Sequence, residues 1–223
     1  MCIFIGGGMV NNSNSQCSTN YRCITCPNVP SLVNSWNTFN PILGGVDVVS
    51  YFTINSITPQ TIYTNYEPLM GNSIFQSIYL GYTYYFNNQE NLNLFNANPS
   101  NYIPQWGGYC AKGIALEYCL SNEKFTQLQK IIPNISNGYS WNSNCLGPTS
   151  SRDCWIIING KLFLFYRNKA RNIFMSNVIQ NYNIGTYRWN NFIQIWKNNN
   201  VNPSIIMSTM SFPYQSGVNT TIY

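Results

Sequence analysis

The sequence predicts an α+β domain, with helices and short strands interleaved without a regular strand–helix–strand repeat. Two observations support this. The segment CWIIINGKLFLFY at 154–166 has two apolar runs flanking Asn159-Gly160, a pair typical of a tight hairpin turn because both positions need a positive φ. Segments with helical spacing of apolar residues precede and follow it. We expect a small antiparallel sheet with this hairpin at its centre, buried on both faces and packed against several helices.

The first half of the domain is expected to contain two strands and a helix. GGVDVVSYF at 44–52 is typical of a turn and a short strand, and YLGYTYYF at 79–86 of a second strand. Asn87 and Glu90 have the spacing of a capping box that begins a helix, and Pro99 ends that helix. Its buried stripe is expected to consist of Leu92, Leu94 and Phe95.

The spacing of apolar residues predicts four further helices. One begins near Gly108, and a second begins at Asn122 and ends before Pro133. After the hairpin, Asn168 caps a third helix and a fourth spans about 186–197. The residues expected on the buried faces of the last three are Phe125, Leu128, Ile132, Ala170, Ile173, Phe174, Val178, Trp189, Phe192, Ile193 and Trp196.

The chain divides into three parts by composition. Residues 1–40 are rich in Asn, Ser, Cys and Pro and lack periodicity, which predicts an irregular N-terminal arm tied by cystines. Residues 41–198 hold the periodic segments and form the expected domain, with an insertion at about 117–153. Residues 199–223 again lack periodicity and are expected to be an irregular tail.

Charged residues are scarce, at 8% of the chain against roughly 25% in an ordinary soluble domain. Asparagine takes their place, and the net charge of +5 comes from scattered basic residues. Counterion-driven binding of nucleic acid needs a broader basic face, so we expect no nucleic-acid partner. No apolar run approaches the ~20 residues of a membrane span, so we expect none.

Eight cysteines and no histidine favour a disulfide framework over a mixed Cys/His metal site. This predicts a secreted or cell-surface protein, because disulfides persist in oxidising compartments. Three sequons add candidate N-glycosylation sites at Asn11, Asn134 and Asn219. The disulfide candidates are Cys2, Cys17, Cys23, Cys26, Cys110, Cys119, Cys145 and Cys154.

Three segments in order resemble the YHS-domain family: GGVDVVSYF at 44–52, YLGYTYYFNNQENLNLFNANPSNYIPQWGGYCAKGIA at 79–115, and WIIINGKLFLFY at 155–166. The resemblance is to the small stand-alone branch, whose pattern runs from D-x-V-x-Y-F through G-G-Y-C-A to W-x-x-x-x-G-K-L-Y-L. It covers roughly residues 44–197 with one interruption. YHS domains resemble small metal-handling modules found with copper-transporting ATPases and some oxygenase components. The stand-alone branch is largely without assigned chemistry.

The resemblance places the family cysteine at Cys110, after Gly107, Gly108 and Tyr109. A cysteine near a helix N-terminus is expected to have a lowered thiol pKa, which suits a ligand or a reactive thiol. Two departures change this expectation. Lys112 stands where the family has a tyrosine, and the insertion brings further cysteines close in sequence. We therefore expect Cys110 to form a disulfide, first with Cys119, or with Cys145 or Cys154 if one unbroken helix separates the first pair.

The supply of catalytic groups is poor. Histidine is absent, the six acidic residues are well separated, and no nucleophile elbow, phosphate loop or dinucleotide fingerprint is present. Asp47 is expected to stabilise a turn. The sequence therefore predicts a protein without enzymatic activity or cofactor, which acts by binding another protein or by self-assembly. The alternative is a copper-handling protein that uses Cys110 with a methionine such as Met70, Met175, Met207 or Met210, since thiolate and thioether ligands suit copper(I).

Overall fold

The computed structural model describes residues 40–57, 67–118, 122–137 and 150–198. These residues form helices and small two-stranded sheets, two of them antiparallel, so the α+β class is confirmed. The predicted cystine-tied arm and the tail at 199–223 lie outside the described residues. None of the described helices is both long and apolar enough to cross a membrane.

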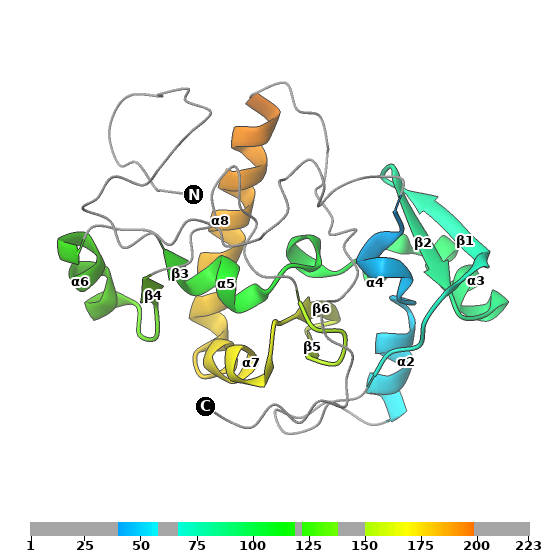
Figure 1. Cartoon of the computed structure of the whole chain (residues 1–223), viewed down its shortest axis with the longest axis horizontal. Coiled ribbons are helices and arrows are strands. Elements are labelled where there is room, and N and C mark those ends of the chain that lie inside the picture. The colour runs from blue at the N-terminus through cyan, green and yellow to red at the C-terminus, as the bar shows by residue number, and fades with distance from the viewer. Residues whose placement is uncertain (1–39, 58–66, 119–121, 138–149, 199–223) are drawn as a thin grey trace.

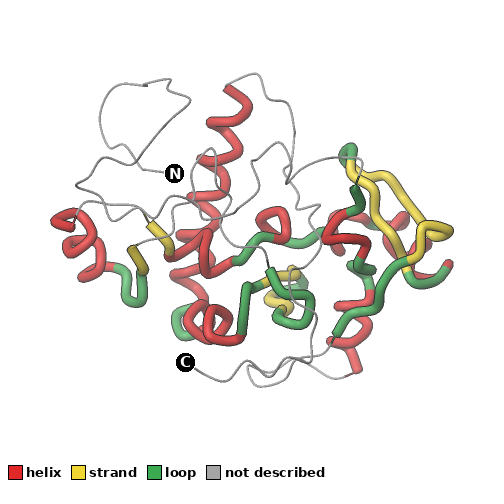
Figure 2. Tube along the Cα trace, viewed as in Figure 1, coloured by secondary structure: helices red, strands yellow, loops and turns green. Residues whose placement is uncertain are grey.

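Figures 1 and 2 show how the described helices and strands are arranged in space. Figure 1 shows the β1–β2 hairpin at one end of the molecule and α6 with β3 and β4 at the other. The elements are η1 (Ile42–Gly45), α2 (Ser50–Ile57), β1 (Asn72–Tyr79), β2 (Tyr82–Phe86), α3 (Gln89–Ala97), α4 (Pro99–Tyr102), η2 (Gln105–Gly108), α5 (Ala111–Leu116), β3 (Glu117–Tyr118), α6 (Asn122–Ile131), β4 (Ser136–Asn137), β5 (Trp155–Ile158), β6 (Lys161–Leu164), α7 (Asn168–Met175) and α8 (Val178–Asn198).

The predicted hairpin is present as β5 and β6. Asn159 and Gly160 have φ values of 50° and 70°, as a type I′ turn requires. The strands pair antiparallel from Trp155 opposite Leu164 to Ile158 opposite Lys161. Among the described strands the hairpin is not the centre of a larger sheet, because β5 and β6 pair with each other and with no other described strand. One parallel bridge joins Leu164 to Cys110.

Burial on both faces of this hairpin is confirmed, because it separates two hydrophobic clusters. Phe163 and Ile156 face the Trp106 cluster, whereas Leu162 and Trp155 face the Phe95 cluster. The Trp106 cluster consists of Trp106, Tyr109, Cys110, Ala111, Ile114, Ala115, Leu116, Tyr118, Ile132, Ile135, Cys154, Ile156, Phe163, Phe165, Phe174 and Trp189. The Phe95 cluster consists of Ile42, Leu43, Val46, Val48, Val49, Tyr51, Tyr82, Tyr84, Phe86, Phe95, Trp155, Leu162 and Leu164.

The strand predicted at 44–52 is wrong, because the chain turns and then enters α2. The Oδ1 atom of Asp47 accepts hydrogen bonds from the backbone N–H groups of Val49 and Ser50, at 2.9 and 3.2 Å. Side-chain acceptors of this kind stabilise the start of a helix. These two hydrogen bonds offset the preference of the neighbouring β-branched residues for a strand. The turn-stabilising role predicted for Asp47 is confirmed.

The single strand predicted at 79–86 is interrupted by a second tight turn. Leu80 and Gly81 have φ values of 52° and 82°, so Tyr79 ends β1 and β2 begins directly after the turn. The helix that follows is capped by Asn88 rather than Asn87, since the side chain of Asn88 accepts from the N–H of Asn91.

Three further details of the helices differ from the predictions. Leu94 lies on the exposed side of α3, so the stripe predicted there is wrong at that position. Asn168 does not cap α7, because Arg167 occupies the N-cap position, and the side chain of Asn168 accepts from Cys154 instead. The last helix begins at Val178, earlier than the predicted 186.

Candidate functional site

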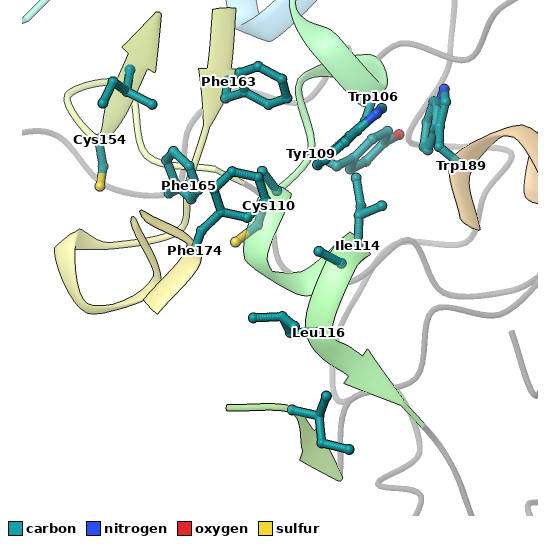
Figure 3. Close-up of a cluster of buried hydrophobic side chains, with 14 of the residues drawn as sticks. Trp106, Tyr109, Cys110, Ile114, Leu116, Cys154, Phe163, Phe165, Phe174 and Trp189 are labelled. Carbon is teal, nitrogen blue, oxygen red and sulfur yellow. The ribbon is translucent and has the colours of Figure 1, made fainter. Parts of the chain in front are cut away.

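The QWGGYCAKG segment spans η2 and the start of α5, and η2 contains a left-handed turn. Trp106, Gly107 and Gly108 all have positive φ values, of 49°, 67° and 76°. A Cβ at Gly108 would lie 2.8 Å from the Cδ2 atom of Leu43, so the backbone conformation and the close approach both require glycine there. The turn directs Trp106 and Cys110 into the same cluster, as Figure 3 shows.

The thiol of Cys110 is buried in the Trp106 cluster, with 1% of the residue exposed. Its pKa is raised from 9.0 to about 11, mainly by burial and to a smaller extent by the Glu117 carboxylate. Backbone hydrogen bonds from Tyr166 and Gly113 and the charge of Lys112 oppose this rise. The expected lowering of the pKa by the helix N-terminus is therefore wrong. Desolvation outweighs the weak dipole of α5, a helix of six residues.

Cys154 is the second buried thiol of the same cluster (Figure 3). It precedes β5, and its Sγ atom donates to Oδ1 of Asn168 at 3.3 Å. Burial raises its pKa from 9.0 to about 12, partly opposed by the charge of Arg171. Neutral thiols are poor nucleophiles and poor metal ligands, so these surroundings favour packing over chemistry.

Both described cysteines are free thiols, so the Cys110–Cys154 disulfide, one of the expected pairings, is not formed in this structure. Cys119 and Cys145, the other expected partners of Cys110, lie outside the described residues. The remaining disulfide candidates, Cys2, Cys17, Cys23 and Cys26, lie outside them as well.

The metal alternative gains no ligand set from the described part of the chain. No group of three or more His, Cys, Asp or Glu side chains gathers there in a way that could hold a metal ion. Of the methionines expected as thioether partners, Met207 and Met210 lie outside the described residues. Met70 is exposed, and Met175 is partly buried against the Trp106 cluster. Within the described residues, Cys110 therefore contributes one protonated thiol.

A buried ionic cluster joins α5 to α8 beside Cys110. Lys112 and Glu117 form an ion pair with Nζ and Oε1 2.9 Å apart, and their side chains are 12% and 9% exposed. Arg188 of α8 donates to the backbone carbonyls of Ile114 and Glu117 and lies over the ring of Tyr118, 3.9 Å from its centroid. These bonds satisfy carbonyls at the C-terminal end of α5, which have no partner within the helix. The cluster therefore fixes the two helices together.

Sequence reasoning missed this cluster because its members are far apart in the chain. Arg188 donates to a carbonyl 71 residues away. One signal was available. Arg188 directly precedes Trp189, which is expected on the buried face of the last helix, and a cation that is buried beside it requires an acceptor. Lys112, where the sequence departs from the YHS pattern that it resembles, forms an ion pair with Glu117.

The β1–β2 hairpin carries the second candidate site, on the surface. Ile74 and Ile78 are 78% and 74% exposed on alternate residues of β1, and Gln76 between them is exposed as well. We call these three residues the hairpin face. The chain from 68 to 89 contains no charged residue. Exposed apolar residues on an uncharged strand are typical of a contact surface.

The candidate glycosylation site at Asn134 is exposed and lies in a turn with φ of 64°, so the structure leaves its side chain accessible. Its amide lies 3.4 Å from the hydroxyl of Ser176. Asn11 and Asn219 lie outside the described residues.

No family model, no curated protein and no solved structure matches this chain.

Proposed function

We propose that this protein is a YHS-like domain without enzymatic activity, which binds another polypeptide through the hairpin face. The observation that carries this proposal is the exposure of Ile74 and Ile78 on a segment that has no charge. Leaving two isoleucines in water costs free energy that burial against a partner would recover, at about 25 cal/mol per Å² of apolar surface.

The hydrogen-bonding capacity of the hairpin suits a peptide-binding role. Its strand β1 has a described neighbour, β2, on one edge only, and an extended peptide adds to such an edge through backbone hydrogen bonds. The absence of charge between 68 and 89 favours uncharged partners, because a charged segment would lose hydration there without gaining a counter-charge.

The segment that carries the family resemblance supports a structural role for Cys110. Its glycines shape a turn, Trp106 packs on Phe163 and Phe174 in edge-on contacts, and the thiol is buried and protonated. Copper handling through Cys110 would require the thiol to ionise in this apolar surrounding. Metal analysis of the purified protein tests that alternative: one equivalent of copper that is lost in Cys110→Ala would favour it over the binding role.

The binding role is tested with a displayed library of uncharged peptides, selected against the purified chain. We expect the selected peptides to bind wild type and to lose at least tenfold in affinity for Ile78→Lys, since that change places a charge in the contact. Ile179→Lys is the matched control. Ile179 is 75% exposed on α8 and receives the same added charge away from the hairpin. Equal binding to the two variants, or no selected peptide, would contradict the proposal.

A further inference from the structure

The free edge of β1 presents backbone groups in a defined order. Tyr79 and Tyr82 close the two-residue turn, and the pair that closes such a turn is hydrogen bonded. In an antiparallel ladder the pairing alternates, so Tyr79 and Ser77 direct their N–H and C=O groups to β2. Gln76 and Ile78 therefore direct theirs to the opposite edge, where no described strand pairs with them.

This edge lacks the usual protection against pairing. Soluble proteins guard exposed edge strands with charged side chains, proline or bulges. β1 has neither charge nor proline. It does have an irregularity between Asn72 and Gln76, where the N–H of Ile74 is bonded to the side chain of Asn72. This irregularity, a bulge, hinders pairing at the start of the strand. The segment from Gln76 to Tyr79 remains regular and available for pairing.

We propose that a second copy of this chain pairs with β1 along this edge, antiparallel, with the two-fold axis passing at Ser77. Gln76 of each copy then lies opposite Ile78 of the other, and each of these two pairs exchanges two backbone hydrogen bonds. Ser77 faces its own counterpart. Phe75 lies opposite Tyr79 of the second copy, an aromatic pair of the kind that stabilises neighbouring strands. The two hairpins become one four-stranded sheet.

Other two-fold registers form fewer fully bonded pairs. An axis at Gln76 would form one fully bonded pair and would place Ile78 opposite Ile74, whose N–H is already bonded to Asn72. An axis at Ile78 would form one bonded pair and would place Gln76 opposite Leu80, which lies in the turn at a positive φ. The axis at Ser77 uses both outward-directed residues of each copy, and this decides the register.

The register makes a copy of the chain a suitable occupant, because the edge is complementary to itself and carries no charge. The molecule carries a net charge of +5, so two copies repel over most orientations, but the hairpin brings no charged residue into the contact. Pairing also joins the exposed isoleucines of both copies into one apolar face. The contact is small beside the roughly 1,600 Å² of a standard interface, so we expect a dissociation constant in about the micromolar range. This inference rests on the proposed function, because it names the partner of the same hairpin face.

Sedimentation equilibrium on the full chain tests the pairing at concentrations from about 10 to 500 μM, which span that range. Wild type and Ile179→Lys are expected to show the same monomer–dimer equilibrium, and Ile78→Lys to remain monomeric. Far-UV circular dichroism checks that both variants are folded. A monomeric wild type, or equal dimerisation of the two variants, would overturn the inference.

A cysteine at the axis tests the register without disturbing the apolar face. Residues directly opposite in a pair without hydrogen bonds have Cα atoms about 4.5 Å apart, within the reach of a disulfide. Ser77→Cys is therefore expected to give covalent dimers under mild oxidation, beyond any formed by wild type. Ser73→Cys, exposed in the bulge, is the control and should not. Equal cross-linking at the two positions would overturn the register.

The two proposals fail separately. A monomeric wild type that still binds selected peptides through Ile78 would reject the second copy as occupant and retain the binding role. Loss of both results would reject both proposals.

Discussion

Gly185 of α8 lies directly against the indole ring of Trp106. A Cβ placed at Gly185 would be 2.3 Å from Cη2 of Trp106 and 2.8 Å from two further ring atoms. Trp106 is held on its other sides by Phe163, Phe174 and Tyr182, so its ring has no room to withdraw. This contact sets how closely α8 approaches the turn that carries Cys110.

Gly185→Ala is therefore expected to destabilise the protein. Alanine in place of glycine normally favours a helix by about 1 kcal/mol. Here the overlap with Trp106 should outweigh that gain and leave a net loss of about 1–3 kcal/mol, as overpacked cores do. Urea unfolding followed by tryptophan fluorescence measures it. Tyr187→Ala, at a residue 66% exposed on the same helix, is the control and should change little. A variant as stable as wild type would show that the ring can move.

Gly160→Val tests the turn of the buried hairpin. A Cβ at Gly160 would meet no heavy atom within 4 Å, so any loss of stability comes from its φ of 70° and not from a clash. We expect a loss of about 1–3 kcal/mol for valine, which resists a positive φ. Gly160→Asn should lose less, because asparagine tolerates this conformation. If the two variants melt at the same temperature as wild type, the turn assignment is wrong.

Asp47 is expected to be among the most sensitive polar residues of the chain. Its two carboxylate oxygens accept hydrogen bonds from the N–H groups of Val49, Ser50 and Asn87, and from the side-chain amide of Asn91 at 2.6 Å. Asp47→Ala leaves buried donors without an acceptor, at about 1–3 kcal/mol for each one that water cannot reach. We expect a total loss of about 2–5 kcal/mol in thermal or urea unfolding.

Glu90→Ala provides the comparison for this loss. Glu90 is exposed in the first turn of α3, where Asn88 and not a capping box holds the helix start. Its removal should change stability by no more than about 0.5 kcal/mol. A loss at Glu90 equal to that at Asp47 would mean that general surface charge, and not the four hydrogen bonds, accounts for the effect.

The sequence predicted those parts of the fold that local chemistry decides. Asn159-Gly160 marked a hairpin because both residues accept a positive φ, and the apolar runs beside them indicated burial on both faces. Leu80-Gly81 makes a turn with the same signs of φ, yet it was missed, because leucine rarely adopts this conformation. At 44–52 a strand was predicted from β-branched residues, but the hydrogen bonds of Asp47 favoured a helix start.

The candidate site depended on contacts that no local pattern shows. The expected low pKa of Cys110 followed from its place before α5, but the cluster that buries its thiol includes aromatic residues from β6, α7 and α8. Lys112 and Glu117 are close in sequence, whereas Arg188 joins them only after α8 packs on α5. The exposed face of β1 was also missed, because alternation alone does not show which side of a two-stranded sheet is left uncovered.

Alkaline pH is expected to destabilise the protein through its buried thiols. The folded pKa of Cys110 is raised from 9.0 to about 11, so folding favours the neutral thiol. The contribution of the neutral thiol to the stability of the folded protein is fully present below pH 9 and is lost as the pH rises towards 11. The difference of 2 pKa units corresponds to about 3 kcal/mol for a fully buried group. Cys154, raised to about 12, acts in the same direction.

Cys110→Ala separates this thiol from the other groups that titrate in the same range, such as the buried Tyr84, whose pKa is also raised by burial. The free energy of unfolding of wild type should fall more steeply between pH 9 and 11 than that of the variant. At pH 8 both thiols should resist alkylation in the folded protein and react fully in denaturant without reductant. Parallel pH profiles for the two proteins, or rapid labelling of Cys110 in the folded chain, would show that this thiol is open to solvent and available as a ligand.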